Sequence, residues 1–294
     1  MTVAALKTWP RDVVLVASMA LAELRHRRSL LVVSVLTVGF LVLYGWGVFE
    51  ILPSVTDRVG ANIREEDTKR GVGFILLGIA VFATFSLASV LAVFTTMSTV
   101  KGEAELGLLQ SMLVRPIARS AVVTGRVVAA TFAGFVYCAV VISGASLLTS
   151  AAGGTPPGNL PAVILALTAA LAVVAGFGVL LSTVFGTAAT GMATTMLISI
   201  GFFSSLVRQI GESTDSPTVA ARADLVSHVL GFNVLYEGAL GSLTAGVAGL
   251  AGLVIQLGPF GTQREFGSDL VLLTVAELVL LVSAATWRLR RLDL

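Results

Sequence analysis

Six long apolar runs, separated by more polar segments, dominate the pattern of hydrophobic and polar positions along the chain. Each run has roughly 20 residues, enough for a helix to cross about 30 Å of hydrocarbon. Backbone polar groups in lipid must pair within their own segment, so each run predicts a transmembrane α-helix. The predicted spans are 30–50, 72–98, 120–149, 160–185, 187–208 and 269–288.

Composition agrees with this pattern. Of the 294 residues, 56% are hydrophobic and 12% are charged, whereas a soluble globular domain carries about 25% charged residues. The sequence therefore predicts an all-α integral membrane protein, with residues 1–294 forming a single transmembrane domain. No early apolar run with a small-residue cleavage site precedes the first span, so we expect that span to be retained.

The positions of lysine and arginine predict the orientation of the chain. Basic residues gather before the first span, between the second and third, and after the last. They are Lys7, Arg11, Arg25, Arg27, Arg28, Lys101, Arg115, Arg119, Arg126, Arg288, Arg290 and Arg291. Six spans place these three regions on one side, so both termini are expected to be cytoplasmic in a multi-pass protein of the cell membrane.

The segment 209–268 is expected to be extracytoplasmic, and part of it resists a simple count. Residues 238–257 are themselves about as long as a span, but a seventh crossing would place the arginine-rich C-terminus outside. Gly241, Ala245 and Gly249 recur every four residues, which favours close packing against another helix. We expect a helix or helical hairpin at the outer interface, with an additional crossing as the alternative.

Before the first span, residues 1–29 are expected to form a cytoplasmic or interfacial helix. One face of that helix is apolar, and an arginine-rich cluster follows it. The face comprises Val13, Val16, Ala17, Ala20, Leu21 and Leu24. Such a helix could lie in the lipid headgroups or extend the first span into the cytoplasm.

The sequence carries no motif of a catalytic, cofactor or metal site. It has no glycine-rich phosphate loop with lysine, no H-E-x-x-H and no G-x-S-x-G. Cys138 is the only cysteine, and His26 and His228 are expected on opposite sides of the membrane. We therefore expect a protein that is not an enzyme, with no catalytic, cofactor-binding or metal-binding residues, no cofactor of its own and no nucleic-acid partner.

A few charges lie within or at the ends of the spans. Glu277 is in the middle of the last span, where a carboxylate is costly and suggests a function. It could serve transport or coupling, or it could be protonated or hydrogen-bonded as a packing residue. Glu50 and Arg208 lie at the predicted outer ends of the first and fifth spans, and we expect both to be interfacial anchors.

Residues 101–116, KGEAELGLLQSMLVRP, predict a short amphipathic helix. Its apolar face comprises Leu106, Leu108, Leu109, Met112 and Leu113. Glu103 and Glu105 suit the positive end of the helix dipole, and Pro116 ends the helix. The following span begins near Ser120, a plausible N-cap.

The opposite face of this helix holds Glu103, Gln110 and Ser111. A helix lying on lipid would be expected to carry lysine or arginine there. The composition favours a protein partner with an apolar groove. A helix lying flat on lipid and a cytoplasmic extension of spans two and three are the alternatives.

The longer stretch KGEAELGLLQSMLVRPIARSAVVTGR resembles a motif of type-two ATP-binding-cassette export permeases. The similarity is closest to the six-span branch that includes the copper and nitrous-oxide-reductase maturation permease. The matching positions are Glu103, Glu105, Gly107, Leu109, Leu113, Pro116, Arg119, Gly125 and Arg126. AGFGVLLSTVFGTAATGMATTM and FNVLYEGALGSL also resemble family segments, the latter with Val234 where proline is common.

The resemblance implies a permease subunit that exports a substrate and pairs with a cytoplasmic ATPase subunit, which would bind ATP and magnesium. It also implies a second permease copy, as a homodimer, surrounded by membrane lipid. The coupling residues would be Glu103, Glu105, Leu106, Gly107, Leu109, Met112, Leu113, Pro116 and Arg119. The turn from Phe185 to Ala189 would form a second, smaller contact.

Two alternatives remain at this stage. A mechanical subunit could drive an extracytoplasmic partner without moving a solute, with residues 208–269 as the contact surface. A secondary transporter driven by an ion gradient would need polar groups within the spans and an inverted repeat. Only Glu277 meets the first requirement, and no repeat is visible in the sequence.

Overall fold

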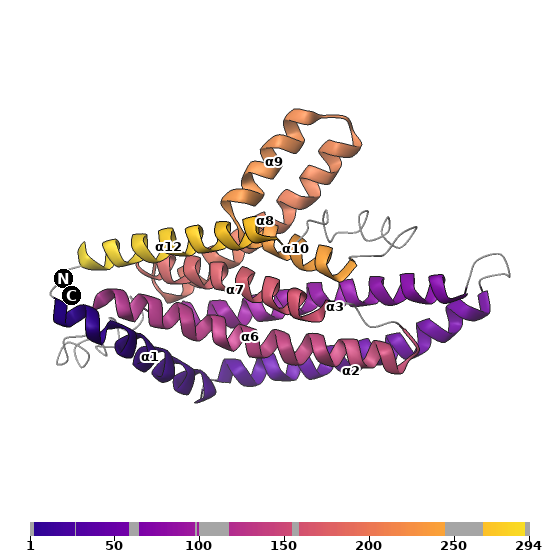
Figure 1. Ribbon diagram of the computed structural model, residues 1–294, viewed down its shortest axis with the longest axis horizontal. Coiled ribbons are helices and arrows are strands. Elements are labelled where there is room, and N and C mark those ends of the chain that lie inside the picture. Colours follow the sequence, from indigo (N-terminus) through magenta and orange to yellow (C-terminus); the bar gives the residue numbers. More distant parts are fainter. Residues whose placement is uncertain are drawn as a thin grey trace.

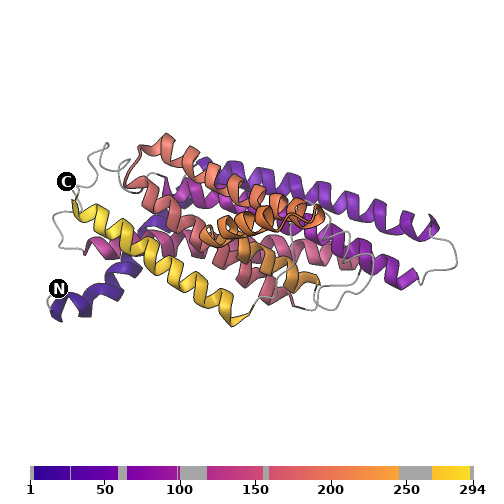
Figure 2. The same cartoon turned by 90° about the horizontal axis from the view of Figure 1, so that it is seen from above.

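The computed structural model of the protein is all-helical in the part of the chain that it describes, residues 3–26, 28–58, 65–97, 99, 118–154, 159–244 and 267–291. The helices lie roughly along one long axis (Figures 1 and 2). The described helices are α1 (Val3–His26), α2 (Arg28–Arg58), α3 (Glu65–Thr96), α6 (Arg119–Ala151), α7 (Leu160–Ser182), α8 (Thr187–Ser213), α9 (Pro217–Val229), α10 (Phe232–Thr244) and α12 (Ser268–Arg291).

Six of the described helices are long and apolar enough to cross a membrane, in agreement with the six predicted spans. Their apolar lengths are Leu30–Ser54, Gly71–Thr96, Arg119–Ala151, Leu160–Ser182, Thr187–Ser213 and Ser268–Arg291. The fifth runs on to Ser213, beyond the predicted end at 208. The protein is therefore a multi-pass membrane protein.

Helix α7 occupies the centre of the bundle. It packs against α3, α6, α8, α10 and α12. Within its most apolar stretch 67% of the residues are buried, against 28% in α2 and 22% in α12. Its alanines and glycines let neighbouring helices approach closely, so α7 forms the core while α2 and α12 present apolar side chains outward, as lipid contact requires.

The start of α1 and the end of α12 lie at the same end of the helical bundle (Figure 1). Here Arg119 Nη1, at the start of α6, donates a hydrogen bond of 2.8 Å to the backbone oxygen of Leu289 in α12. Trp9 Nε1 in α1 donates a 3.2 Å hydrogen bond to Ser120 Oγ. The sequence suggested Ser120 as the N-cap of this span, but Ser120 is not the N-cap of α6. Ala118 occupies that position without a side-chain cap.

Helix α1 rests on the first turns of α6. Val13, Val16, Ala17 and Leu24 of its predicted apolar face are buried. At Gly125 in α6 a β-carbon would lie 2.7 Å from Val16 Cβ, so glycine is needed for this close approach. The apolar face of α1 is therefore directed to protein.

Helices α8 and α9 form a hairpin that stands out from the bundle (Figure 1). The chain reverses at Asp215, whose φ of 54° is in the left-handed region that aspartate tolerates better than most residues. A β-carbon at Gly211 would lie 2.8 Å from the backbone nitrogen of Ala220, so the two helices touch directly behind the turn.

The first part of the 238–257 segment, up to Thr244, belongs to α10, which already begins at Phe232. This helix packs on α7 and α3. Phe232 and Tyr236 join an aromatic cluster with Phe85 of α3 and Phe202 of α8. The remainder of the segment, including Ala245 and Gly249, lies outside the described residues.

Candidate functional site

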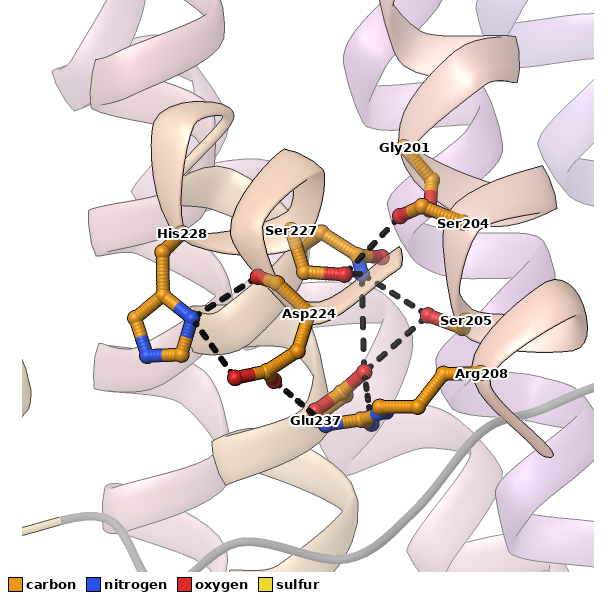
Figure 3. A network of polar contacts seen from close by, with 9 residues as sticks. Gly201, Ser204, Ser205, Arg208, Asp224, Ser227, His228 and Glu237 are labelled. Carbon is orange, nitrogen blue, oxygen red and sulfur yellow. Dashed lines mark hydrogen bonds and ion pairs between the residues drawn. The ribbon is translucent and has the colours of Figure 1, made fainter. Parts of the chain in front are cut away.

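A buried polar cluster lies where α8, α9 and α10 meet (Figure 3). We call it the α8–α10 polar cluster. Its members are Ser204, Ser205 and Arg208 from α8, Asp224, Ser227 and His228 from α9, and Asn233 and Glu237 from α10. Polar side chains are expensive to bury unless they are hydrogen-bonded, so a cluster of this density in an otherwise apolar chain marks a candidate site.

Arg208 and Glu237 form the centre of the cluster. Arg208 Nη2 lies 2.7 Å from Glu237 Oε1, and the two side chains are 6% and 0% exposed. Arg208 Nη1 also contacts Asp224 Oδ1 at 3.1 Å. The arginine thus joins a carboxylate of α9 to a carboxylate of α10. Removing one partner of such a buried pair costs about 3–5 kcal/mol, because the other charge is left uncompensated.

Neutral side chains complete the centre. Asn233 Nδ2 donates to Ser205 Oγ at 2.7 Å and to Ser227 Oγ at 3.2 Å. Ser205 Oγ in turn donates to Glu237 Oε1 at 3.0 Å. Ser204 and Ser227 are hydrogen-bonded at 2.9 Å. The amide of Asn233 and the serine hydroxyl groups therefore link α8, α9 and α10, the same three helices that the Arg208 ion pairs link.

The outer edge of the cluster is accessible. Asp224 and His228 are 38% and 43% exposed, and His228 Nδ1 lies 3.4 Å from Asp224 Oδ2. The same ring nitrogen is 2.9 Å from the Asp224 backbone oxygen one turn earlier in α9. The cluster therefore has a buried centre and a solvent- or headgroup-facing edge. Its chemistry is suited to fastening helices together.

Sequence reasoning assigned Arg208 to the membrane interface, and this was wrong. The side chain is buried because α9 and α10 fold back over the end of α8 and supply two carboxylates. One signal was present: Glu237 stands alone within the apolar stretch FNVLYEGALGSL. A lone carboxylate there needs a cation, and Arg208 is near in sequence.

Glu277 lies in the middle of α12, as expected, and is half-buried. Both of its carboxyl oxygens are enclosed and make no hydrogen bond within the described residues. The backbone of Gly231, between α9 and α10, lies beside the carboxyl without the geometry of a hydrogen bond. Glu277 is therefore adjacent to α10 but is not a member of the polar cluster.

Most of the predicted coupling residues lie outside the described part of the chain. These are Glu103, Glu105, Leu106, Gly107, Leu109, Met112, Leu113 and Pro116. Arg119 is described, and its bond to Leu289 joins α6 to α12. The α7–α8 turn at residues 183–186 is described too, and Phe185 in it is exposed.

Gly125 and Arg126, the last two positions of the motif, lie inside α6. Gly125 packs against the side chain of Val16, and Arg126 Nη1 pairs with Glu23 Oε2 of α1 at 2.9 Å. A small pocket beside this pair is lined by residues of α1, α3 and α6, among them Glu23, Thr95 and Arg126. Both motif positions thus serve the contact between α1 and α6.

The described polar residues of the spans otherwise behave as expected. Serine and threonine hydroxyls donate to backbone oxygens one turn earlier, for example Thr84 to Ala80, Thr131 to Val127 and Thr274 to Leu270. Among the described residues no three His, Cys, Asp or Glu side chains are grouped as metal ligands. The polar cluster is set apart by a connected set of side-chain bonds that joins three helices at one place.

No model of a known protein family matches this chain, and no curated protein matches it. Fold and composition define the class as an all-helical, multi-pass membrane protein with a polar cluster at the junction of α8, α9 and α10.

Proposed function

We propose that this protein is the membrane-spanning permease subunit of an ATP-driven export complex. The observation that carries the proposal is the amphipathic segment 101–116, which stands between the second and third of six spans and resembles the coupling motif of type-two permeases. In this proposal the segment is a coupling helix that rests in a groove of a cytoplasmic ATPase.

The packing of the described helices supports this role for the segment. Residues 101–116 connect α3 to α6, and α6 is tied to α12 by Arg119 and to α1 by Trp9 and Arg126. A movement of the segment would therefore be transmitted to α6, and through α6 to α12 and α1. In this proposal the exposed Phe185, in the α7–α8 turn, supplies a second, smaller contact with the ATPase. ATP and magnesium belong to the partner, and a second copy of this chain completes the permease.

The α8–α10 polar cluster fits this proposal as the part that keeps α8, α9 and α10 together. Alternating access needs elements that move as units between two arrangements. A network with a buried ion pair holds α8, α9 and α10 in one arrangement while the other helices shift. In this proposal the cluster makes the three helices move as one unit, and it does not bind the exported substrate.

Co-purification tests the coupling helix. The proposal expects a soluble P-loop ATPase to be encoded near this chain. The chain is expressed together with that ATPase, in wild-type form and as Leu109→Asp or Leu113→Asp. Both substitutions place a charge in the apolar face, so the ATPase should be lost from the purified complex while the chain still inserts. Ser111→Asp, on the polar face of the same helix, is the matched control and should retain the ATPase. Equal recovery with all variants would refute the proposal.

A second candidate is a mechanical subunit that drives an extracytoplasmic partner. The α8–α9 hairpin favours it, because the hairpin stands out from the bundle and exposes Leu225 and Val229. The reconstituted complex distinguishes the two. An exporter stimulates ATP hydrolysis with a soluble or lipid substrate, whereas a mechanical subunit responds only when the partner protein is added. Full activity of the isolated chain without any ATPase would contradict both and favour a secondary transporter.

A further inference from the structure

The turn between α9 and α10 is built around the carboxyl group of Glu277. A β-carbon added at Gly231 would overlap with Glu277 Oε2. Among the described residues Gly153 is the only glycine with a left-handed φ, so Gly231 adopts a conformation that alanine also tolerates. The space beside Gly231 is taken by the carboxyl of α12, so a side chain at 231 would displace the end of the Glu277 side chain.

The carboxyl has no compensating charge in the described part of the chain. Helix α7, against which α12 packs, has no titratable side chain. On α10, Glu237 is directed to Arg208 and Tyr236 lies among aromatic rings of α3 and α8. An ionised carboxylate enclosed in a membrane span without a partner is costly.

The remaining titratable groups of the neighbouring helices are directed elsewhere. On α6, Arg119 contacts Leu289 and Arg126 contacts Glu23, while Tyr137 bonds to Thr37. Cys138 of α6 is buried in the core. On α9, Asp224 and His228 contact each other, Asp224 also contacts Arg208, and Arg222 is exposed. Asp269, on α12 itself, lies about two turns before Glu277.

The enclosure decides which cation can neutralise Glu277. A metal ion such as calcium takes about six to eight oxygen ligands, whereas here one carboxyl lies against one backbone segment. A cationic substrate would need access, and both carboxyl oxygens are covered. A proton needs a single oxygen and no ligand shell. The site is matched to a proton by size and by its number of ligands.

We propose that Glu277 is a proton-binding latch between α12 and the α9–α10 turn. With a proton bound, the neutral carboxyl packs against Gly231 and keeps α12 in contact with the turn. When the proton leaves to water, the carboxylate moves toward solvent and the contact opens. Each cycle of closing and opening binds one proton at the Glu277 carboxyl and releases it again, and no other reactant is required.

Gly231 connects the latch to the α8–α10 polar cluster. It directly precedes α10, whose first turns carry Asn233 and Glu237 of the polar cluster. Opening at Gly231 would therefore release the unit of α8, α9 and α10 from α12 without breaking the cluster. This inference goes beyond the proposed function and does not rest on an ATPase partner.

Distance measurements between spin labels test the latch. Labels are attached at Leu225 of α9 and Leu272 of α12, which are 67% and 68% exposed, in a Cys138→Ala background. The full chain is placed in lipid nanodiscs and studied from about pH 5 to about pH 9, a range that covers buried carboxyl groups. The wild type should show one short distance at low pH and a growing longer population as the pH rises.

Glu277→Gln is the decisive variant, because glutamine keeps the shape of the neutral acid and cannot ionise. It should assemble normally and retain the short distance at every pH. His228→Gln is the control, because it removes a titratable group of α9 and leaves Glu277 in place, and its distances should still respond to pH. A distance that does not depend on pH in the wild type, or a pH response that persists in Glu277→Gln, overturns the proposal. So does failure of Glu277→Gln to accumulate.

A steric experiment tests the same contact without pH. Gly231→Ala places a methyl group where the carboxyl lies, so the longer distance should dominate even at low pH. Adding Glu277→Ala to Gly231→Ala should restore the short distance, since the overlap is removed. Gly267→Ala is the matched control, because a β-carbon there meets nothing within 4 Å. If the pair of substitutions gives the same distances as Gly231→Ala alone, the contact is not the latch.

Discussion

Arg126 and Arg208 are buried to a similar degree but are paired in different ways. The Arg126 side chain is 8% exposed, and its partner Glu23 is 41% exposed. Arg208 is 6% exposed, and Glu237 is fully buried. Arg126 belongs to the contact between α1 and α6, whereas Arg208 belongs to the α8–α10 polar cluster.

The difference lies in where each carboxylate would go if the pair were broken. Glu23 already reaches water or headgroups, so separation costs little. Glu237 has no such route, and its further bond from Ser205 ties it to α8 a second time. We infer that α8, α9 and α10 behave as one fixed unit, while α1 can shift on α6.

The largest effect is expected for Glu237→Ala. This change removes the buried carboxylate from Arg208, whose pair with the half-exposed Asp224 remains. The protein should lose about 3–5 kcal/mol of stability, seen as a lower Tm in detergent by tryptophan fluorescence. Replacing both Arg208 and Glu237 with methionine should recover most of that loss, because no charge is then stranded. If Glu237→Ala melts like the wild type, the pair does not hold the three helices.

An intermediate effect is expected for Gly125→Ala. The new methyl group would meet Val16 Cβ at 2.7 Å and the Val13 backbone oxygen at 3.0 Å, so rotating one side chain does not relieve the overlap. Overpacking of this kind costs about 1–3 kcal/mol. Limited proteolysis should show α1 cleaved faster than in the wild type. Gly39→Ala, where nothing lies within 4 Å, is the control and should not change the cleavage rate.

The smallest effect is expected for Glu23→Ala. Because Glu23 is partly exposed, solvent screens its pair with Arg126, and its loss should lower Tm less than the loss of the fully buried Glu237 does. The same Glu→Ala change at positions 23 and 237 therefore compares the two regions directly. Equal shifts in Tm would mean that burial of the carboxylate does not distinguish the two pairs.

The spans were predictable because hydropathy acts locally. A run such as 160–185 has to be a helix in lipid whatever its neighbours are, and α7 forms there as Leu160–Ser182. The apolar face of α1 followed from helical spacing alone, and four of its six residues are buried in the structure. The site was less predictable. Glu277 was singled out by its position in a span, but Arg208 was assigned to the interface, since sequence position does not reveal that α9 and α10 fold over it.

By itself the sequence determined that this is an all-helical, multi-pass membrane protein, because apolar runs of about 20 residues can pair their backbone groups within lipid only as helices. It also identified Glu277 as a charge that had to be compensated or made neutral. Only the tertiary structure decided the partners: Glu237 and Asp224 for Arg208, Glu23 for Arg126, and the bare backbone of Gly231 for Glu277. The reason is physical, since burial is set by which helices pack together, and the same charge is inexpensive beside water and costly beneath another helix.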